Sequence, residues 1–234
     1  MTSTFDFERA WLAKFAESLD RAAGEYTRQQ VMDGSEALSA ASSREAVIAW
    51  TQQAMERLES LVDEETARRV MTGCACQHPK QGLQAARQAY EETGDPAAAH
   101  RILQTQFEAF LRDSLELERR HVEAVVSRGW GLAGILAGNR ILATKIPKSG
   151  HLADYLDETD PERRRQYYCH CPRVRDILRT GGSLPATYCY CGAGFYKGIW
   201  EEIVQAPVEV EVLKSVLAGD EVCRIAAHLP AKAE

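Results

Sequence analysis

Six of the seven cysteines in this 234-residue chain occur in pairs whose members are separated by one residue. The three Cys-x-Cys pairs are Cys74/Cys76, Cys169/Cys171 and Cys189/Cys191. In an extended segment, side chains two residues apart project from the same face, so each pair would offer two sulfur atoms in one direction. Paired thiols of this kind indicate a metal centre, a reaction at sulfur, or both.

Paired cysteines also occur in secreted scaffolds that are held together by disulfides. The first 20 residues contain acidic side chains and lack both the basic region and the apolar core of an export signal. The weakly polar stretch 130–137 is interrupted by glycine and is too short to cross a bilayer. We therefore expect a cytoplasmic protein with no membrane partner, in which clustered thiols act as metal ligands or nucleophiles.

The composition is that of an ordinary folded protein, with 45% hydrophobic and 26% charged residues. A chain of this length buries a sizeable core, so it does not need the cysteines for stability. The net charge of -6 argues against a nucleic-acid partner, which would require a basic surface. These features leave a small molecule as the expected partner.

Helical periodicity positions the first pair of cysteines. Apolar residues recur every three or four positions up to Gly73, which stands where a helix C-terminus favours glycine. We therefore expect Cys74 and its pair partner in the turn that follows this helix. The dipeptide Asp95-Pro96 predicts the start of a further helix, with the aspartate as its cap.

Strand patterns appear in the second part of the chain. Alternating apolar residues over 208–212 and 222–229 predict two strands, joined by a turn near Gly219 into an antiparallel hairpin. A short strand is expected over 141–146. Between the last two cysteine pairs, a short helix is expected over 172–178.

These elements predict an α+β fold in which a helical half packs on an antiparallel sheet. The helical half covers residues 1–128 with the first pair, and the α+β half covers residues 129–234 with the other two pairs and the hairpin. No low-complexity linker separates them, so we expect one integrated domain. The helical half could also supply the interface of a homodimer.

The C-terminal part of the chain carries a family resemblance. The stretches GAGFYKGIWEEI and PVEVEVLKSVLAGDEVCRIAAHLP resemble the 4-vinyl-reductase-like domain superfamily, over roughly the last third of the chain. They are also similar to proteins known as L-2-amino-thiazoline-4-carboxylic acid hydrolases and to other cysteine-rich prokaryotic proteins. The residues that carry the match are Gly192, Gly194, Gly219, Asp220 and Cys223.

The resemblance implies helices packed on an antiparallel sheet around a pocket for a small molecule, and hydrolysis as the reaction class. Members that sense aromatic compounds hold zinc through a glutamate and cysteines that precede the final cysteine. Val212 and Ser215 stand at those places here, so the resemblance moves the expected metal centre to the Cys-x-Cys pairs.

Two metal centres are compatible with these pairs. The first is a tetrahedral zinc site with four thiolates, in which His78 or His170 is an alternative ligand. The second is an iron–sulfur cluster, because cysteine followed by proline is a familiar context for its ligands. For either centre, the predicted ligands are Cys169, Cys171, Cys189 and Cys191.

A third possibility needs no metal. If a helix begins near Gly192, Cys191 lies at its N-terminus, where the helix dipole favours a thiolate and free N–H groups bind an oxyanion. This thiolate could attack a carbonyl or amidine carbon, with His78 or His170 as general base. Cys223, on the apolar face of the last strand, is expected to be an inert core cysteine.

The leading hypothesis is a small-molecule enzyme with a cysteine-rich metal–thiolate centre, a hydrolase or lyase for a compound that contains sulfur or nitrogen. Its predicted substrate-binding and acid–base residues are Cys74, Cys76, His78 and His170. One alternative is a sensor of small apolar molecules with a structural zinc ion. The others are an iron–sulfur enzyme and a thiol-based metal-handling protein.

Overall fold

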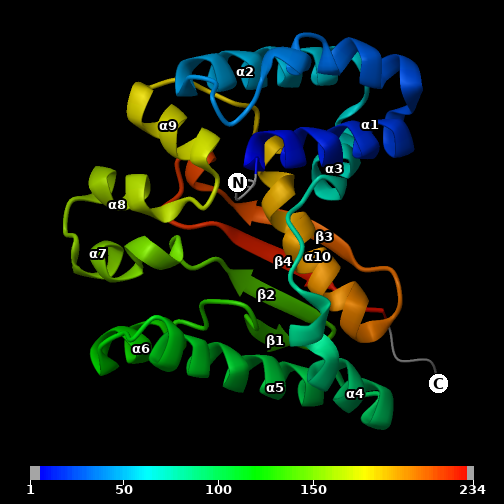
Figure 1. Ribbon diagram of the computed structural model, residues 1–234. Coiled ribbons are helices and arrows are strands. Elements are labelled where there is room, and N and C mark those ends of the chain that lie inside the picture. Colours follow the sequence, from blue (N-terminus) through cyan, green and yellow to red (C-terminus); the bar gives the residue numbers. More distant parts are fainter. Residues whose placement is uncertain (1–5, 231–234) are drawn as a thin grey trace, which may run out of the picture. The chain divides into compact units, whose positions relative to one another are not determined.

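The computed structural model describes residues 6–230, which Figure 1 traces from the N-terminal helices to the last strand. The chain forms two compact units, and each unit is built from two separate segments of sequence. The first unit comprises residues 6–76 and 171–194, and the second comprises residues 77–170 and 195–230. Position 128, where the sequence analysis divides the chain, lies inside the second unit.

The first unit is helical. Its elements are α1 (Phe7–Met32), η1 (Ser35–Ala37), α2 (Arg44–Leu61), α3 (Glu64–Gly73), α9 (Pro172–Thr180), η5 (Ala186–Cys189) and the start of α10 (Tyr190–Val204). The side chains of Asp6, Ser43 and Asp63 accept backbone hydrogen bonds at the starts of α1, α2 and α3. The apolar faces of these helices bury Phe15 and Leu58 completely.

The second unit combines helices with a sheet. Its helical elements are η2 (Lys80–Leu83), α4 (Gln84–Thr93), α5 (Pro96–Ala109), η3 (Phe110–Ser114), α6 (Arg119–Val126), η4 (Ser149–His151), α7 (Leu152–Asp157), α8 (Pro161–Tyr168), the rest of α10 and η6 (Val216–Ala218). Its strands are β1 (Ile135–Ala137), β2 (Arg140–Thr144), β3 (Glu209–Lys214) and β4 (Arg224–His228). Asp95 caps α5 as the sequence predicts, because its carboxylate accepts from the N–H of Ala97.

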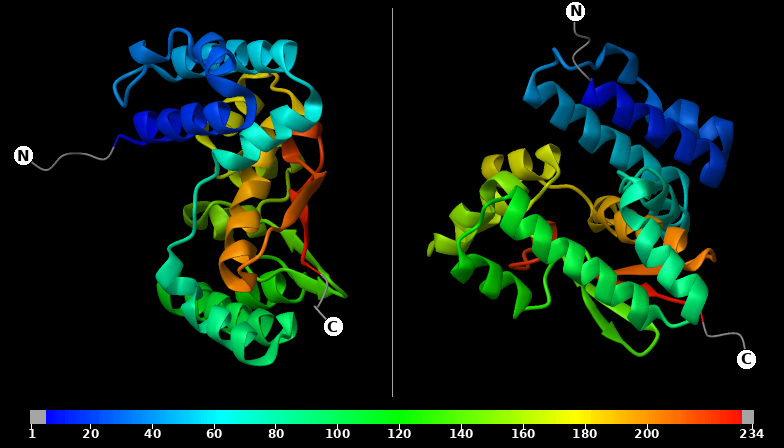
Figure 2. Two further views of the ribbon diagram at one scale, coloured as in Figure 1. Left: turned by 90° about the vertical axis from the view of Figure 1, so that its right-hand side faces the viewer. Right: turned by 60° about the horizontal axis from the view of Figure 1, so that its bottom comes forward.

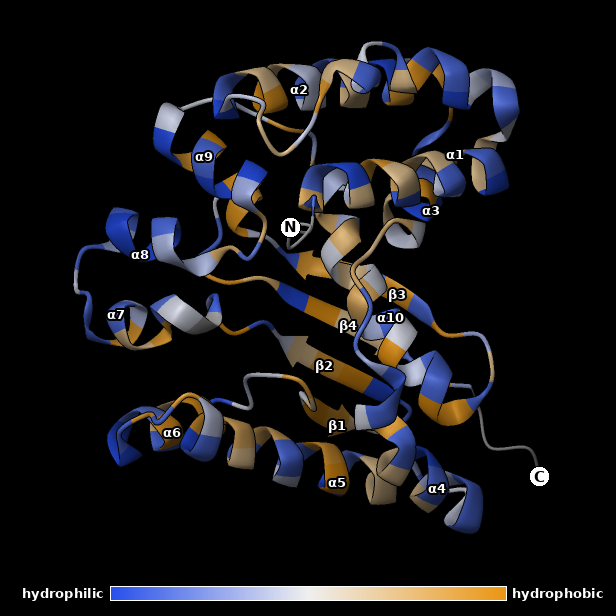
Figure 3. Cartoon of the chain, viewed as in Figure 1, coloured by the Kyte–Doolittle hydropathy of each residue, from blue (hydrophilic) through white to orange (hydrophobic). Residues whose placement is uncertain are grey.

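The four strands form one antiparallel sheet in the order β1-β2-β4-β3. Val212 pairs with Ile225 in the terminal hairpin, which confirms the hairpin predicted from alternation. Figure 3 shows apolar residues along β1 and β2 and in the middle of β4. Those buried at the centre of the sheet are Ile141, Ala143, Ile225 and Ala227.

The part of α10 within the second unit lies along one face of the β3–β4 hairpin, as Figure 2 shows in its left view. Trp200 is completely buried on this helix. Lys197 donates to the carbonyl oxygen of Val208 at 2.6 Å, and Glu201 accepts from the N–H of Val208 at 3.2 Å. These bonds connect the helix to the start of the hairpin.

The helical N-terminal half and the four-stranded antiparallel sheet in the C-terminal half confirm the α+β prediction. The small-molecule pocket stays a prediction. Among the helices of residues 6–230, none combines the length and the apolar character that crossing a bilayer requires.

Candidate functional site

Cys74 lies at the C-terminal cap of α3 in the first unit, in the turn that the sequence predicts. Its side chain is completely buried. Gly73 precedes it because a Cβ atom at this position would collide with Ser18 Oγ of α1, whose hydroxyl donates to the carbonyl of Val70 at 2.7 Å. The close packing of α3 against α1 therefore holds the Cys74 thiol inside the protein.

The partner of this thiol comes from a different cysteine pair. The Cys74 side chain is hydrogen-bonded to Cys191, and Cys74 Sγ also lies 3.2 Å from the carbonyl oxygen of Met71. A thiol carries one proton, which rotates between these two acceptors. When Cys191 is ionised, its negative sulfur is the stronger acceptor, and the Cys74 proton points toward it.

Cys191 is the second residue of α10, which begins at Tyr190. The turn η5 leads directly into α10, and the N–H of Tyr190 already bonds the carbonyl oxygens of Thr187 and Tyr188, so it is the helix dipole that favours a negative charge near Cys191. Gly194 follows in the same turn, and a Cβ atom there would lie 2.7 Å from Ala75 Cβ and would collide with the carbonyl of Thr72. Glycine thus lets α10 start directly against the segment that carries Cys74.

The environment of Cys74 favours its protonated form. The hydrogen bond to Cys191, burial, and the nearby charges of Cys191 and Cys76 raise the pKa of Cys74 well above its ordinary value. Cys74 therefore keeps its proton at neutral pH, whereas Cys191, which is half-buried, is the more accessible thiol of the pair.

Tyr188 adds a third polar group. Its hydroxyl lies 3.5 Å from Cys171 Sγ, and its ring packs 6.4 Å from Trp11. Burial and the charges of Cys171 and Cys191 raise the pKa of Tyr188, so its phenol stays protonated beside both sulfurs. We define Cys74, Cys191, Cys171 and Tyr188 as the thiol centre of the first unit.

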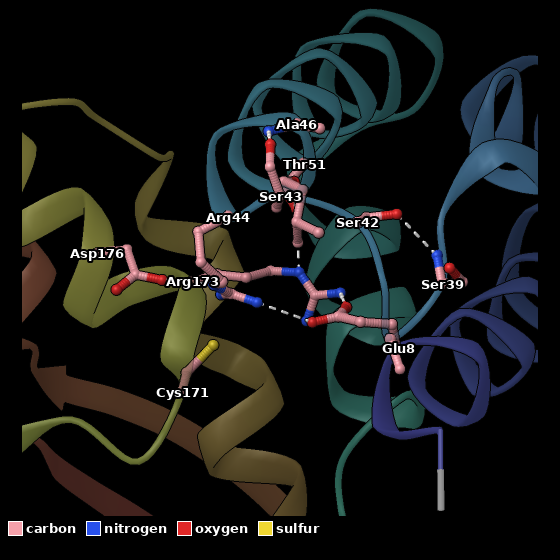
Figure 4. Close-up of polar contacts among 12 residues, drawn as sticks. Glu8, Ser39, Ser42, Ser43, Arg44, Ala46, Thr51, Cys171, Arg173 and Asp176 are labelled. Atoms are coloured by element: carbon pink, nitrogen blue, oxygen red, sulfur yellow. Dashed lines mark hydrogen bonds and ion pairs between the residues drawn. The ribbon is translucent and has the colours of Figure 1, made fainter. Parts of the chain in front are cut away.

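An ion-pair network centred on the buried pair Arg173–Glu8 lies in the first turn of α9, next to its N-cap residue Cys171. Arg173 is completely buried, bonds to Glu8 and to Thr51 Oγ1, and stacks 4.1 Å from the centre of the Trp11 ring. Arg44 joins the network through Glu8 at 3.0 Å and Asp176 at 2.8 Å. Figure 4 shows both arginines between the two carboxylates, with the Cys171 sulfur on the side that faces them. The sequence analysis missed Arg173, although it shares the inner face of α9 with Ile177, four residues later.

The structure distributes the predicted site residues over both units. Cys76 is exposed in the segment after α3, and Cys189 is half-buried at the end of η5. Cys189 and Cys191 lie in helical turns, so the rule for extended segments does not apply to this pair. Cys169 is buried at the C-terminal end of α8 in the second unit, although Cys171 belongs to the first.

Both predicted histidines belong to the second unit. His78 Nδ1 lies 3.0 Å from the carbonyl oxygen of Pro79, and its ring packs 6.3 Å from that of Phe195. His170 Nε2 lies 3.0 Å from the carbonyl oxygen of Ile146. The described residues of the first unit include no histidine.

The predicted metal ligands belong to both units, with Cys169 in the second and the other three in the first. Within residues 6–230, no group of three or more Cys, His, Asp or Glu side chains is placed to hold a metal ion. The arrangement therefore lends no support to the four-thiolate zinc site or to the iron–sulfur alternative, and both stay predictions.

Comparison with known proteins yields one partial match. The model of a family of unknown function (DUF6144) matches residues 158–232. This segment includes Cys171, Tyr188 and Cys191 of the thiol centre and leaves out Cys74. No curated protein and no solved structure matches the chain. The comparisons therefore assign no activity.

Proposed function

We propose that this chain is a small-molecule enzyme in which the Cys191 thiolate is the nucleophile. One observation carries the proposal, namely the hydrogen bond between the buried Cys74 thiol and Cys191 at the start of α10. A thiol donor and a helix N-terminus both stabilise a thiolate, and the thiolate is the reactive form of cysteine. The proposal keeps the cysteine-centred enzyme that the sequence predicts and places its reacting group.

The chemistry begins with an electrophilic atom of the substrate beside Cys191. The thiolate adds to this atom, and the dipole of α10 favours any negative charge that develops near the start of the helix. Tyr188 keeps its proton and can donate it to a sulfur or oxygen anion. For the hydrolase that the resemblance implies, the electrophile is a carbonyl or amidine carbon, and water releases the product.

Zinc remains a separate proposal for the same protein. Metal analysis of the untagged protein, purified anaerobically, tests it. About one zinc ion per chain would support the predicted thiolate centre. A metal-free protein would leave the Cys191 nucleophile as the only centre proposed here.

Thiol alkylation tests the nucleophile directly. The reduced protein is treated with iodoacetamide between about pH 6 and pH 9, and each cysteine is followed by peptide mass spectrometry. We expect Cys191 to react at the lowest pH, and Cys74→Ala to move its onset to higher pH because the thiol donor is lost. Cys223→Ser, which changes a buried thiol of the second unit, should leave the profile unchanged.

The exposed Cys76 provides the internal reference. If Cys191 reacts no faster than Cys76 and with the same dependence on pH, the proposed nucleophile is wrong.

A further inference from the structure

We infer that the substrates of this centre are small disulfides, which Cys191 attacks and Cys74 resolves. The inference rests on the proposed nucleophile and names its substrate class. It assigns a role to the second thiol, which an attack on carbon does not require. In this reaction the two thiols end as one disulfide, and the substrate is released as two thiols.

The first support is the approach of the two chain segments. The sulfurs of Cys74 and Cys191 are in hydrogen-bond contact. A Cβ atom on Gly194 would lie 2.7 Å from Ala75 Cβ, so the backbones beside the two cysteines approach closely. Disulfide-bonded cysteines have their Cβ atoms about 3.8 Å apart, so segments this close can be bridged with little movement.

The second support is the asymmetry of the pair. Cys191 is half-buried and can meet a substrate, whereas Cys74 is completely buried. A mixed disulfide on Cys191 therefore presents its inner sulfur to Cys74 within the protein. Because Cys74 belongs to the same protein molecule, it acts at a very high effective concentration and reacts with the mixed disulfide before a second substrate molecule can.

The third support is that the reaction needs only the two thiols. Thiol–disulfide exchange requires no further base or acid, because a thiolate attacks and a thiolate leaves. Cys74 and Cys191 therefore suffice for both displacements.

The atoms and electrons balance over two displacements. Cys191 Sγ forms a bond to one sulfur of the substrate, and the other sulfur leaves as a thiolate. Cys74 Sγ then bonds to Cys191 Sγ and displaces the remaining substrate sulfur, while the Cys74 proton passes to a released thiolate. The substrate gains two electrons and the pair loses them; a low-molecular-weight thiol in excess reverses the exchange and restores the pair.

The test uses 4,4′-dithiodipyridine, whose two halves leave as 4-thiopyridone, which is followed by its ultraviolet absorption. The reduced full-length protein receives one equivalent under anaerobic conditions, is quenched with N-ethylmaleimide and is mapped by mass spectrometry. We expect both halves to be released and a Cys74–Cys191 disulfide to form. In Cys74→Ala, one half should remain on Cys191, with release of the second half at least about 100-fold slower.

The outcomes separate this inference from the proposed function. If Cys191 of the unaltered protein keeps one thiopyridine and no bridge to Cys74 forms, the disulfide inference is overturned while the nucleophile survives. If Cys191 is not modified at all, both fail. The unaltered protein alone decides between these results, so the test does not depend on the folding of a variant. Cys223→Ser should behave as the unaltered protein does.

Discussion

Two buried cysteines, one in each unit, differ in the groups that contact their sulfur atoms. Cys74 and Cys223 are both buried, and the pKa of each is raised. For Cys74 the largest cause is the hydrogen bond to another thiol, whereas for Cys223 it is burial. Cys223 Sγ accepts from the N–H of Val216 at 3.5 Å, which is a backbone contact. A second sulfur within reach, rather than burial, is what gives Cys74 a possible reaction.

The buried tyrosines beside these cysteines differ in the same way. Tyr168 donates to the carbonyl oxygen of Lys145 at 2.6 Å and accepts from the N–H of Cys223 at 2.9 Å, so its hydroxyl ties two backbone segments together. Tyr188 instead places its hydroxyl against the sulfur of Cys171. The same residue type thus stabilises the sheet in the second unit and lines the thiol centre in the first.

Among the changes that test this comparison, Gly194→Ala should have the largest effect on stability and on the reaction of the thiol pair. Alanine favours a helix over glycine by about 1 kcal/mol, but here its Cβ atom would collide with the backbone of Thr72. We expect a net loss of at least about 3 kcal/mol in the free energy of unfolding, measured in urea, and no Cys74–Cys191 bridge with the disulfide probe.

Gly198→Ala is the matched control on the same helix, because its Cβ atom would meet the flexible end of the Gln77 side chain. This variant should keep its stability within about 1 kcal/mol. Equal stability of the two variants would contradict the close approach of α10 to the Cys74 segment.

Tyr168→Phe should lower the stability of the second unit by a smaller amount and leave the thiol centre of the first unit unaffected. The change leaves the buried N–H of Cys223 without this acceptor, so we expect a loss of about 2 kcal/mol in the free energy of unfolding. The rate of Cys191 alkylation should not change. Tyr26→Phe, at a side chain that is 69% exposed, serves as control for both measurements and should alter neither.

Alkaline pH should have the smallest effect on the free energy of unfolding, and both Cys74 and Cys223 should contribute to this effect. Folding raises the pKa of Cys74 and of Cys223, so above about pH 9 the unfolded chain releases protons that the folded chain holds. The free energy of unfolding should therefore fall as pH rises, by up to about 1.4 kcal/mol per pH unit for each group.

Urea unfolding between about pH 7 and pH 10 measures this slope. Cys223→Ser should flatten it, since serine does not titrate in this range, and should cost about 1 kcal/mol at neutral pH. A slope that is identical in Cys223→Ser and in the unaltered protein would show that Cys223 does not share the effect.

Local features of the fold could be predicted from the sequence, because local patterns determine them. The turn after Gly73, the cap at Asp95 and the terminal hairpin all follow from neighbouring residues. The strand β1 was not predicted, since its three residues are too few to establish an alternation.

The thiol centre depends on contacts between residues far apart in sequence. Cys-x-Cys spacing favours partners within a pair, but Cys74 contacts Cys191 because Gly194 lets two distant segments meet. The sequence places Cys191 near the start of a helix, but it does not reveal that Cys74 is the hydrogen-bond partner of Cys191. The burial of Arg173 was detectable as a charged residue on an otherwise apolar helix face.

The first unit consists of two segments that the ribosome synthesises at different times. Residues 6–76 leave the ribosome early, but the unit also needs residues 171–194. Until that second segment emerges, Cys74 has neither Cys191 nor the start of α10 beside it. The thiol is then open to oxidants and to foreign thiols during most of translation, and its protection depends on the redox state of the compartment in which the chain is made.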